Sequence, residues 1–214
     1  MKIAVLTSEA SWFVPYGKDL AGRLSKKGFA AQFFLEHSQI DESYQVVFIL
    51  SYFKLIEEQF LNKHKYNLVV HESDLPRGKG WSPLFWQVIE GKNRIPIVLF
   101  EAATGVDSGD IYIKDYIELD GNELHDKIRE KQAMKTIQMC EKFLGGRESI
   151  VPKSQKGEET YYPKRTPSDS ELDMNKSLLE QFNLLRTVSN EDFPAFFYYK
   201  GNKYILKIFK EECK

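Results

Sequence analysis

The 214-residue sequence has few cysteines and no long apolar run. Its two cysteines, Cys140 and Cys213, are too few and too far apart for a disulfide framework or a zinc ribbon. We therefore expect ordinary thiols in a reducing cytoplasm and no metal site. No stretch approaches the roughly 18 apolar residues of a membrane span, and Met1–Leu6 does not resemble a signal peptide. These absences predict a cytoplasmic protein without a membrane span.

An excess of positive charge is also missing. Lysine and arginine together number 30, aspartate and glutamate 31, and the formal net charge is −1. Proteins that bind nucleic acid normally use a positive field, so we expect no nucleic-acid partner. No Gly-x-Gly-x-x-Gly motif follows the first apolar run, so the sequence does not predict a bound NAD.

What the sequence does have is an alternation of short apolar runs and amphipathic segments. Its 42% hydrophobic and 14% aromatic content indicates a globular protein. We expect strands over residues 3–7, 30–35, 46–50, 68–70, 95–100 and 111–117, and helices over 19–27, 55–61, 83–90 and 123–144. This order is typical of an α/β fold with a Rossmann-like, doubly wound and mainly parallel sheet.

The composition changes after residue 150. Residues 1–150 are predicted to form the main domain, and the polar stretch 151–170 an exposed linker. Residues 171–214 are expected to form a small subdomain, with a helix over 177–186 and a β-hairpin made by 195–199 and 203–208. Four consecutive aromatic residues, Phe196–Tyr199, make both hairpin faces bulky. Either the preceding helix or a second copy of the chain covers one face, and the second case predicts a homodimer.

The stretch from Tyr66 to Trp86 organises the chain. Its apolar start reads as a buried strand that ends on His71, and a loop rich in proline and glycine follows. Ligands of open α/β sheets gather at the carboxyl ends of strands, so His71 is placed where chemistry is usually done. The alternative is a structural histidine that merely ends a strand.

Two motifs in this order resemble a known family. The first is His71-x-Ser-x-Leu-Pro, and after a glycine-bearing loop, a helix and a strand the second runs from Gly105 to Ile111 as Gly-Val-Asp-Ser-Gly-Asp-Ile. They are similar to Asn-x-His-Pro-Ser-Leu-Leu-Pro and Gly-Ile-Asp-Thr-Gly-Asp-Ile of formyltransferases that use 10-formyltetrahydrofolate. The tail Arg165–Ser170, with the hairpin, resembles members that formylate nucleotide-linked aminosugars, including those of pseudaminic-acid type pathways. The likeness covers most of residues 1–210.

The resemblance implies a role for two side chains. Formyl transfer to an amine builds negative charge on the carbonyl oxygen while the nitrogen loses a proton. His71 is then the donor to that oxygen, and Asp107 the carboxylate that orients the imidazole and helps to move protons. We expect both at neighbouring strand ends. Taken alone, Asp107 is more often a turn-forming residue.

The resemblance also suggests contacts for both substrates. The pterin of the co-substrate 10-formyltetrahydrofolate is expected against two groups of residues, namely Ser73 with Leu75, and Ala102, Ala103, Thr104 and Gly105. An anionic acceptor needs cations and stacking surfaces, which four residues could supply, namely Trp12, Tyr52, Lys54 and Lys79. The alternatives are packing roles for the aromatic residues and a solvated loop position for Lys79.

One departure from the family pattern concerns the oxyanion. Val69 replaces the family asparagine two residues before His71, and it has no amide to donate. Loss of one such donor typically costs about 10²–10³ in rate. Asn67 faces the same side of the strand but lies about 6.6 Å further from its end. The roles of Glu72 and Glu101 stay open.

Three functions remain. The favoured one is transfer of a formyl group from 10-formyltetrahydrofolate to the amino group of a UDP- or dTDP-linked amino-deoxysugar, for surface glycan biosynthesis. The second is formylation of methionyl-tRNA or of glycinamide ribonucleotide, and the charge balance argues against the tRNA. The third is a non-catalytic relative that keeps a folate or nucleotide pocket.

Overall fold

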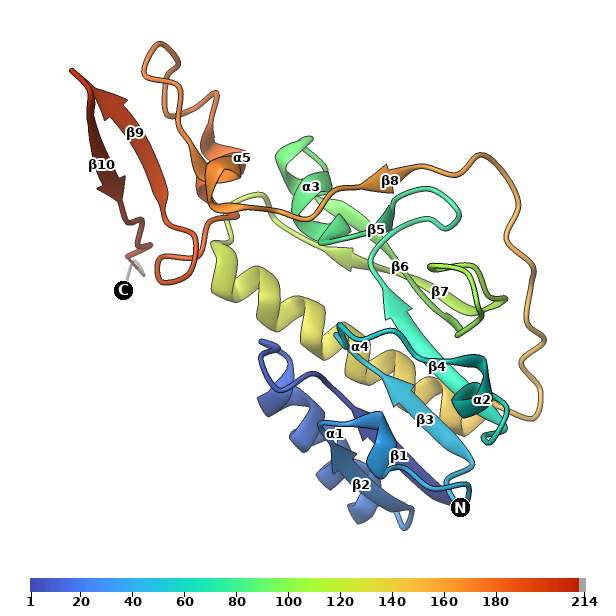
Figure 1. Ribbon diagram of the computed structural model, residues 1–214. Coiled ribbons are helices and arrows are strands. Elements are labelled where there is room, and N and C mark those ends of the chain that lie inside the picture. The colour runs from blue at the N-terminus through green and yellow to red at the C-terminus, as the bar shows by residue number, and fades with distance from the viewer. Residues whose placement is uncertain (212–214) are drawn as a thin grey trace.

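The computed structural model describes residues 1–211, and Cys213 lies outside them. Six strands form the central sheet in the order β2-β1-β3-β4-β6-β7 (Figure 1). Their bounds are β1 Lys2–Leu6, β2 Ala30–Phe34, β3 Val46–Ile49, β4 Tyr66–His71, β6 Arg94–Glu101 and β7 Ile111–Glu118. Strands β1 to β4 pair in parallel, and only β6 runs against its neighbours. The prediction of an α/β fold with a mainly parallel sheet is confirmed.

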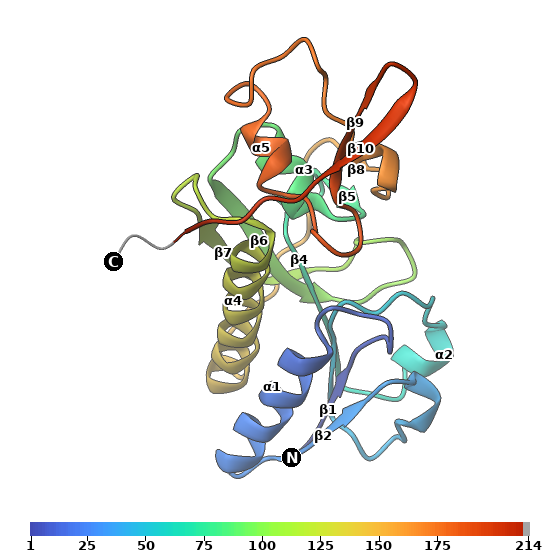
Figure 2. The ribbon, with the colours of Figure 1, turned by 90° about the vertical axis from the view of Figure 1, so that its left-hand side faces the viewer.

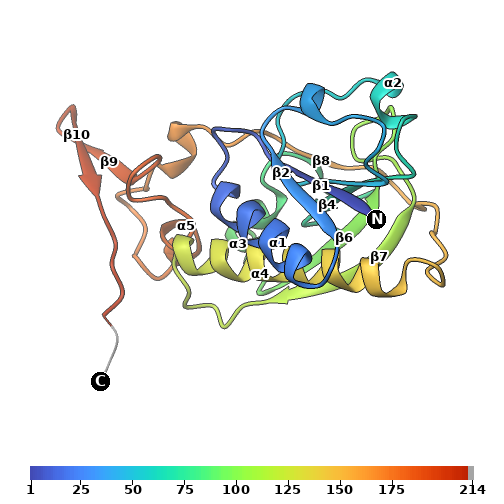
Figure 3. The ribbon, with the colours of Figure 1, turned by 90° about the horizontal axis from the view of Figure 1, so that it is seen from below.

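The sheet is covered on both faces. In β1, Ile3 to Leu6 are all fully buried, which explains why this strand is a continuous apolar run instead of an alternating one. Helices α1 (Val14–Lys26) and α4 (His125–Gly146) lie side by side against one face (Figure 3). The short elements η1 (His37–Gln39) and α2 (Glu58–Leu61) border a smaller core on the other face.

Two helices differ from their predicted limits. Helix α1 begins at Val14, earlier than predicted, because Pro15 suits a first helical turn. Gly17, which lowers helix propensity, is needed there since a Cβ would lie 2.8 Å from the Phe33 ring. The helix predicted over 55–61 is reduced to α2. Leu55 is 89% exposed, so it provides no buried anchor for an additional turn.

The direction of β6 was not anticipated. After β4 the chain forms the loop around residues 72–82 and helix α3 (Pro83–Ile89), and it then returns antiparallel along β4. Glu101, at the carboxyl end of β6, pairs with Leu68, while His71 pairs with Val98. The loop after β6 therefore starts at the end of the sheet away from His71, so the expected adjacency of two strand ends is wrong.

The C-terminal part is attached to this sheet by a mostly exposed segment. Within it, β8 (Tyr161–Tyr162) pairs with β5 (Lys79–Gly80), and η2 (Pro167–Ser170) follows. Helix α5 (Phe182–Leu185) is shorter than the predicted 177–186. The Gln181 side chain binds backbone groups of three preceding residues, Asp173, Lys176 and Ser177, and these bonds hold that segment as a loop.

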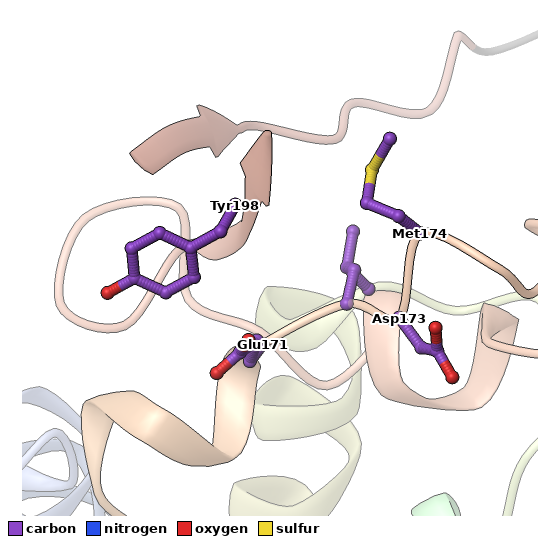
Figure 4. A pocket seen from close by; sticks show the side chains of 5 residues that line it. Glu171, Asp173, Met174 and Tyr198 are labelled. Carbon is purple, nitrogen blue, oxygen red and sulfur yellow. The ribbon is translucent and has the colours of Figure 1, made fainter. Parts of the chain in front are cut away.

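The hairpin of β9 (Ala195–Tyr199) and β10 (Asn202–Leu206) extends away from the sheet (Figures 1 and 2). A cavity of about 390 Å³ lies beside it, lined by Glu171, Leu172, Asp173, Met174 and Tyr198 (Figure 4).

Cys140 is buried in the main core, and burial raises the pKa of its thiol. Within residues 1–211, no helix is both long and apolar enough to cross a bilayer.

Candidate active site

His71 ends β4 and is 7% exposed. Its Nε2 lies 2.8 Å from the carbonyl oxygen of Gly78 and 3.8 Å from Oδ2 of Asp107. A carbonyl oxygen only accepts hydrogen bonds, so Nε2 carries a proton and donates it to Gly78. The ring is thus held with a protonated nitrogen turned toward the carboxylate, 36 residues away in sequence.

Asp107 is held by the loop between β6 and β7. Its backbone adopts the left-handed conformation with φ 47°, which is uncommon outside glycine and is often found at functional sites. The backbone N–H of Gly80 donates to Oδ2 at 3.0 Å, and the Gln155 amide donates to the carbonyls of Asp107 at 2.8 Å and Gly109 at 2.9 Å. The loop thereby reaches back to His71 although β6 ends far from it. The two predicted catalytic side chains do meet.

Glycine is required where this loop crosses β6. A Cβ on Gly109 would lie 1.7 Å from the carbonyl oxygen of Glu101. The Glu101 side chain accepts a hydrogen bond from the Asn67 N–H at 2.6 Å and from the Tyr112 hydroxyl at 3.0 Å, and burial raises its pKa. Glu101 therefore supports the base of the loop.

No residue of β4 replaces the amide donor of the missing family asparagine. Val69 packs against the apolar clusters around Phe100 and Ile49. Asn67 is 3% exposed and donates its amide to the carbonyl of Leu61 at 2.9 Å, so it does not face His71. Neither residue supplies an amide donor to the site.

The loop after His71 is anchored by the segment that follows α4. Lys79 is 2% exposed, and its Nζ lies 2.6 Å from Oε1 of Glu159. The interpretation of Lys79 as a solvated loop lysine is therefore wrong. Thr160 accepts the Gly78 N–H at 2.8 Å through its hydroxyl. A Cβ on Gly80 would lie 2.6 Å from the Tyr162 carbonyl, so this strand pairing needs glycine.

Sequence reasoning missed Gln155, Glu159 and Thr160. All three lie in a polar stretch that reads as a surface connector, and no motif marks them. Their contacts with the two site loops span 46 to 82 residues of sequence. Such distant pairs are visible only in the folded chain.

The residues predicted to hold the folate fall into two groups. Ser73 and Leu75 are buried, and Leu75 packs with Val98 and Phe100. Ala103, Thr104 and Gly105 are exposed on the loop that carries Asp107. Small side chains there leave the backbone open to a flat ring, whereas Ser73 and Leu75 are placed to shape the loop from within.

The predicted acceptor residues are divided between the two faces of the sheet. Trp12 packs with Phe13 and Tyr16 on the α1 and α4 side. Tyr52 belongs to the opposite side, where its hydroxyl lies 2.8 Å from Nδ1 of His37. Lys54 forms an exposed ion pair with Glu36 at 2.5 Å.

An exposed aromatic pair lies next to Gly80, and the sequence did not single out its second member, Trp81. The rings of Phe53 and Trp81 are 5.9 Å apart and are 49% and 41% exposed. The ammonium group of Lys164 lies 4.9 Å from the Trp81 ring. Together they offer a stacking surface with a positive charge beside the loop that touches Asp107.

Comparison with known proteins gives the family. Residues 24–141, more than half of the chain, match the family described as formyl transferase. This chain belongs to the formyl transferase family. The matched range contains both His71 and Asp107, so the two site residues lie within the family's own domain. The family membership predicted from the motifs is confirmed.

A similar curated protein is also a formyltransferase. A methionyl-tRNA formyltransferase of Caldanaerobacter subterraneus is 29% identical over 174 residues, which cover 78% of this chain and 55% of that protein. This chain thus spans about half the length of that relative.

Solved structures share the fold. A methionyl-tRNA formyltransferase of Clostridium thermocellum has a TM-score of 0.79 at 21% identity, covering 95% of this chain and 90% of that one. A 4-N formyltransferase of Francisella tularensis has a TM-score of 0.74 at 16% identity, covering 99% and 98%.

Proposed function

We propose that this chain is an N-formyltransferase that moves a formyl group to the amino group of a nucleotide-linked amino-deoxysugar. Members of the family use formyl-tetrahydrofolate, and 10-formyltetrahydrofolate supplies the formyl group in this proposal. The observation that carries it is the His71–Asp107 pair, with 3.8 Å between Nε2 and Oδ2. The exposed backbone of residues 103–105 is the surface expected to hold the donor.

The chemistry assigns one task to each side chain. His71 is the donor to the formyl oxygen: as negative charge builds there, its Nε2–H turns to that oxygen from the Gly78 carbonyl, which it binds at 2.8 Å in this structure. Asp107 has a carboxylate oxygen 3.8 Å from Nε2 and can accept the proton that the attacking amine loses. The bond from the formyl carbon to N10 breaks as the bond to the sugar nitrogen forms, and the proton ends on N10.

Charge and surface support a nucleotide-sugar acceptor. The net charge of −1 offers no field for a large RNA. The exposed Phe53 and Trp81 rings provide a stacking surface for a nucleobase, and stacking does not require one particular base. We infer UDP or dTDP as the nucleotide, and surface glycan biosynthesis, of which pseudaminic-acid type pathways are one setting, as the use of the product.

Methionyl-tRNA is the second candidate acceptor. It is favoured by the 29% identity to the Caldanaerobacter subterraneus enzyme, which has that name. The two acceptors are separated by supplying 10-formyltetrahydrofolate with a UDP- or dTDP-aminosugar in one assay and with methionyl-tRNA in another. Formylation of the tRNA alone would contradict the proposal.

The decisive variant is His71→Ala in the aminosugar assay. We expect kcat/KM to fall by about 10²–10⁴, the usual contribution of an acid or base. His64→Asn is the matched control, because His64 is also 7% exposed and its Nδ1 bonds a backbone carbonyl that an asparagine amide can reach. Unchanged turnover in His71→Ala would contradict the proposed chemistry. No turnover in wild type with any acceptor would favour a non-catalytic relative.

A further inference from the structure

Two arginine side chains converge on one aromatic ring above the end of the sheet. The guanidinium carbon of Arg129, on α4, lies 4.3 Å from the centroid of Phe85 and 4.3 Å from that of Trp12. The guanidinium carbon of Arg165 lies 5.9 Å from Phe85 and 5.9 Å from Trp86. Three segments far apart in sequence thus bring two positive charges to the same face of α3.

These charges are not neutralised by ion pairs. Within residues 1–211, neither arginine has a carboxylate oxygen within 4.0 Å, and the Nε atoms of both are buried without a hydrogen-bond partner. Arg129 donates to the Gln132 side chain at 2.9 Å, and Arg165 donates to the carbonyls of Thr187 at 3.2 Å and Asp169 at 3.5 Å. Both guanidinium groups therefore keep donors that protein partners do not use.

The two arginines also act on each other. Burial and the charge of Arg165 lower the pKa of Arg129 to about 10, while Glu72 and Asp192 oppose this shift. Burial likewise lowers the pKa of Arg165. An anion bound between them would relieve this repulsion and the cost of burying both charges.

The cluster adjoins the catalytic pair. Glu72, which acts on Arg129, directly follows His71 in the chain. Its carbonyl accepts the Gln87 amide of α3 at 2.7 Å, which fixes α3 against the end of β4. Both arginine residues are half-buried and not fully enclosed.

We propose that Arg129 and Arg165 bind the diphosphate of the acceptor. Planar guanidinium groups suit phosphate oxygens because they offer parallel donors, and the aromatic rings hold them in place without competing for the charge. The site rests on the proposed function, since only a nucleotide-linked acceptor carries this group. It assigns substrate recognition to Trp12 indirectly, through its stacking on Arg129.

Direct binding tests this assignment without turnover. Calorimetry with UDP and dTDP, and with uridine and thymidine, measures what the diphosphate contributes. We expect wild type to prefer one diphosphate over its nucleoside by more than tenfold. Arg165→Gln and Arg129→Lys should each lower the affinity for that nucleoside diphosphate by about 10- to 100-fold, the usual effect of losing hydrogen bonds to a charged group. Nucleoside affinity should stay within twofold.

Three comparisons make the test specific. Arg94→Gln is the matched control, because Arg94 also stacks on an aromatic ring, at 3.7 Å from Tyr116, yet pairs with Glu118. Affinity for tetrahydrofolate should not change in Arg165→Gln or Arg129→Lys. Melting temperature without ligand shows whether each variant is folded, and Arg165→Gln keeps the test open if the Arg129 variant is not.

The outcomes are distinguishable. If wild type binds a diphosphate and both variants bind it equally well, the arginine site is overturned while the proposed acceptor class stands. A loss confined to tetrahydrofolate would overturn it as well, by assigning the arginines to the carboxylates of the donor. If wild type binds neither UDP nor dTDP, the acceptor class itself is wrong and the site falls with it.

Discussion

Replacing Gly109 by alanine is predicted to abolish most activity while leaving the protein folded. The added Cβ would lie 1.7 Å from the Glu101 carbonyl oxygen and 2.7 Å from its carbon, whereas real Cβ atoms essentially never come within 3.0 Å of another heavy atom. The loop must therefore move by at least about 1 Å, an overpacking that typically costs about 1–3 kcal/mol of stability.

That displacement acts on Asp107, two residues away. The carboxylate is held by one hydrogen bond of 3.0 Å from Gly80, and it lies 3.8 Å from His71. A shift of about 1 Å at reacting groups can cost about 100-fold in rate. We expect a loss of this size in kcat with the aminosugar, and a smaller change in KM for it.

The assay compares formyl transfer and thermal unfolding in Gly109→Ala and Gly22→Ala. Gly22 lies in α1 with nothing within 4 Å of an added Cβ, so its replacement should leave the rate unchanged. It should stabilise the helix by about 0.5–1 kcal/mol. Full activity in Gly109→Ala would show that the position of the Asp107 loop does not limit the reaction.

Three further predictions concern stability, anchoring and assembly. Burial opposes ionisation of Glu123, but hydrogen bonds from Lys131 and the Asp120 N–H lower the pKa of its carboxyl group from 4.5 to about 2. The ionised carboxylate therefore stabilises the fold above pH 4.5, and this contribution is lost as the pH falls toward 2. At 1.36 kcal/mol per pKa unit, Glu123→Gln should lower the free energy of unfolding by at most about 3 kcal/mol at pH 7 and by almost nothing at pH 2. Urea unfolding at the two pH values measures this, and an equal loss at both would contradict the prediction. Glu159→Gln should free the segment paired with Lys79, seen as faster amide exchange near Thr160, and unchanged exchange would exclude that anchor. Light scattering should give a homodimer that Ile205→Lys, on the exposed hairpin, converts to a monomer, and a monomeric wild type would end the idea.

The sequence predicted the sheet well because its strands are short apolar runs, of which β1 and β3 are buried on both faces. The motifs around His71 and Asp107 also identified residues that lie together. Strand direction was not readable from these patterns. Residues 72–93 have the length of a crossover between parallel strands, but they form the site loop and α3 near the His71 end of β4, and the chain then returns antiparallel.

The omitted site residues share one physical cause. Gln155 and Thr160 act through single hydrogen bonds to backbone atoms of distant loops, and such bonds leave no periodic pattern. Arg129 lies on α4, where an isolated arginine at helical spacing normally reads as a solvated residue. Its stacking between Trp12 and Phe85 depends on the packing of three helices and loops.

In the proposed reaction His71 and Asp107 act as one unit. A double-mutant cycle with His71→Ala, Asp107→Asn and the combined variant tests it, with kcat/KM for the UDP- or dTDP-aminosugar as the readout. Each single change should cost about 10²–10⁴, and the combined variant should be little worse than the poorer single one. Losses that multiply in the combined variant, or a single variant as active as wild type, would show that the two side chains do not act together.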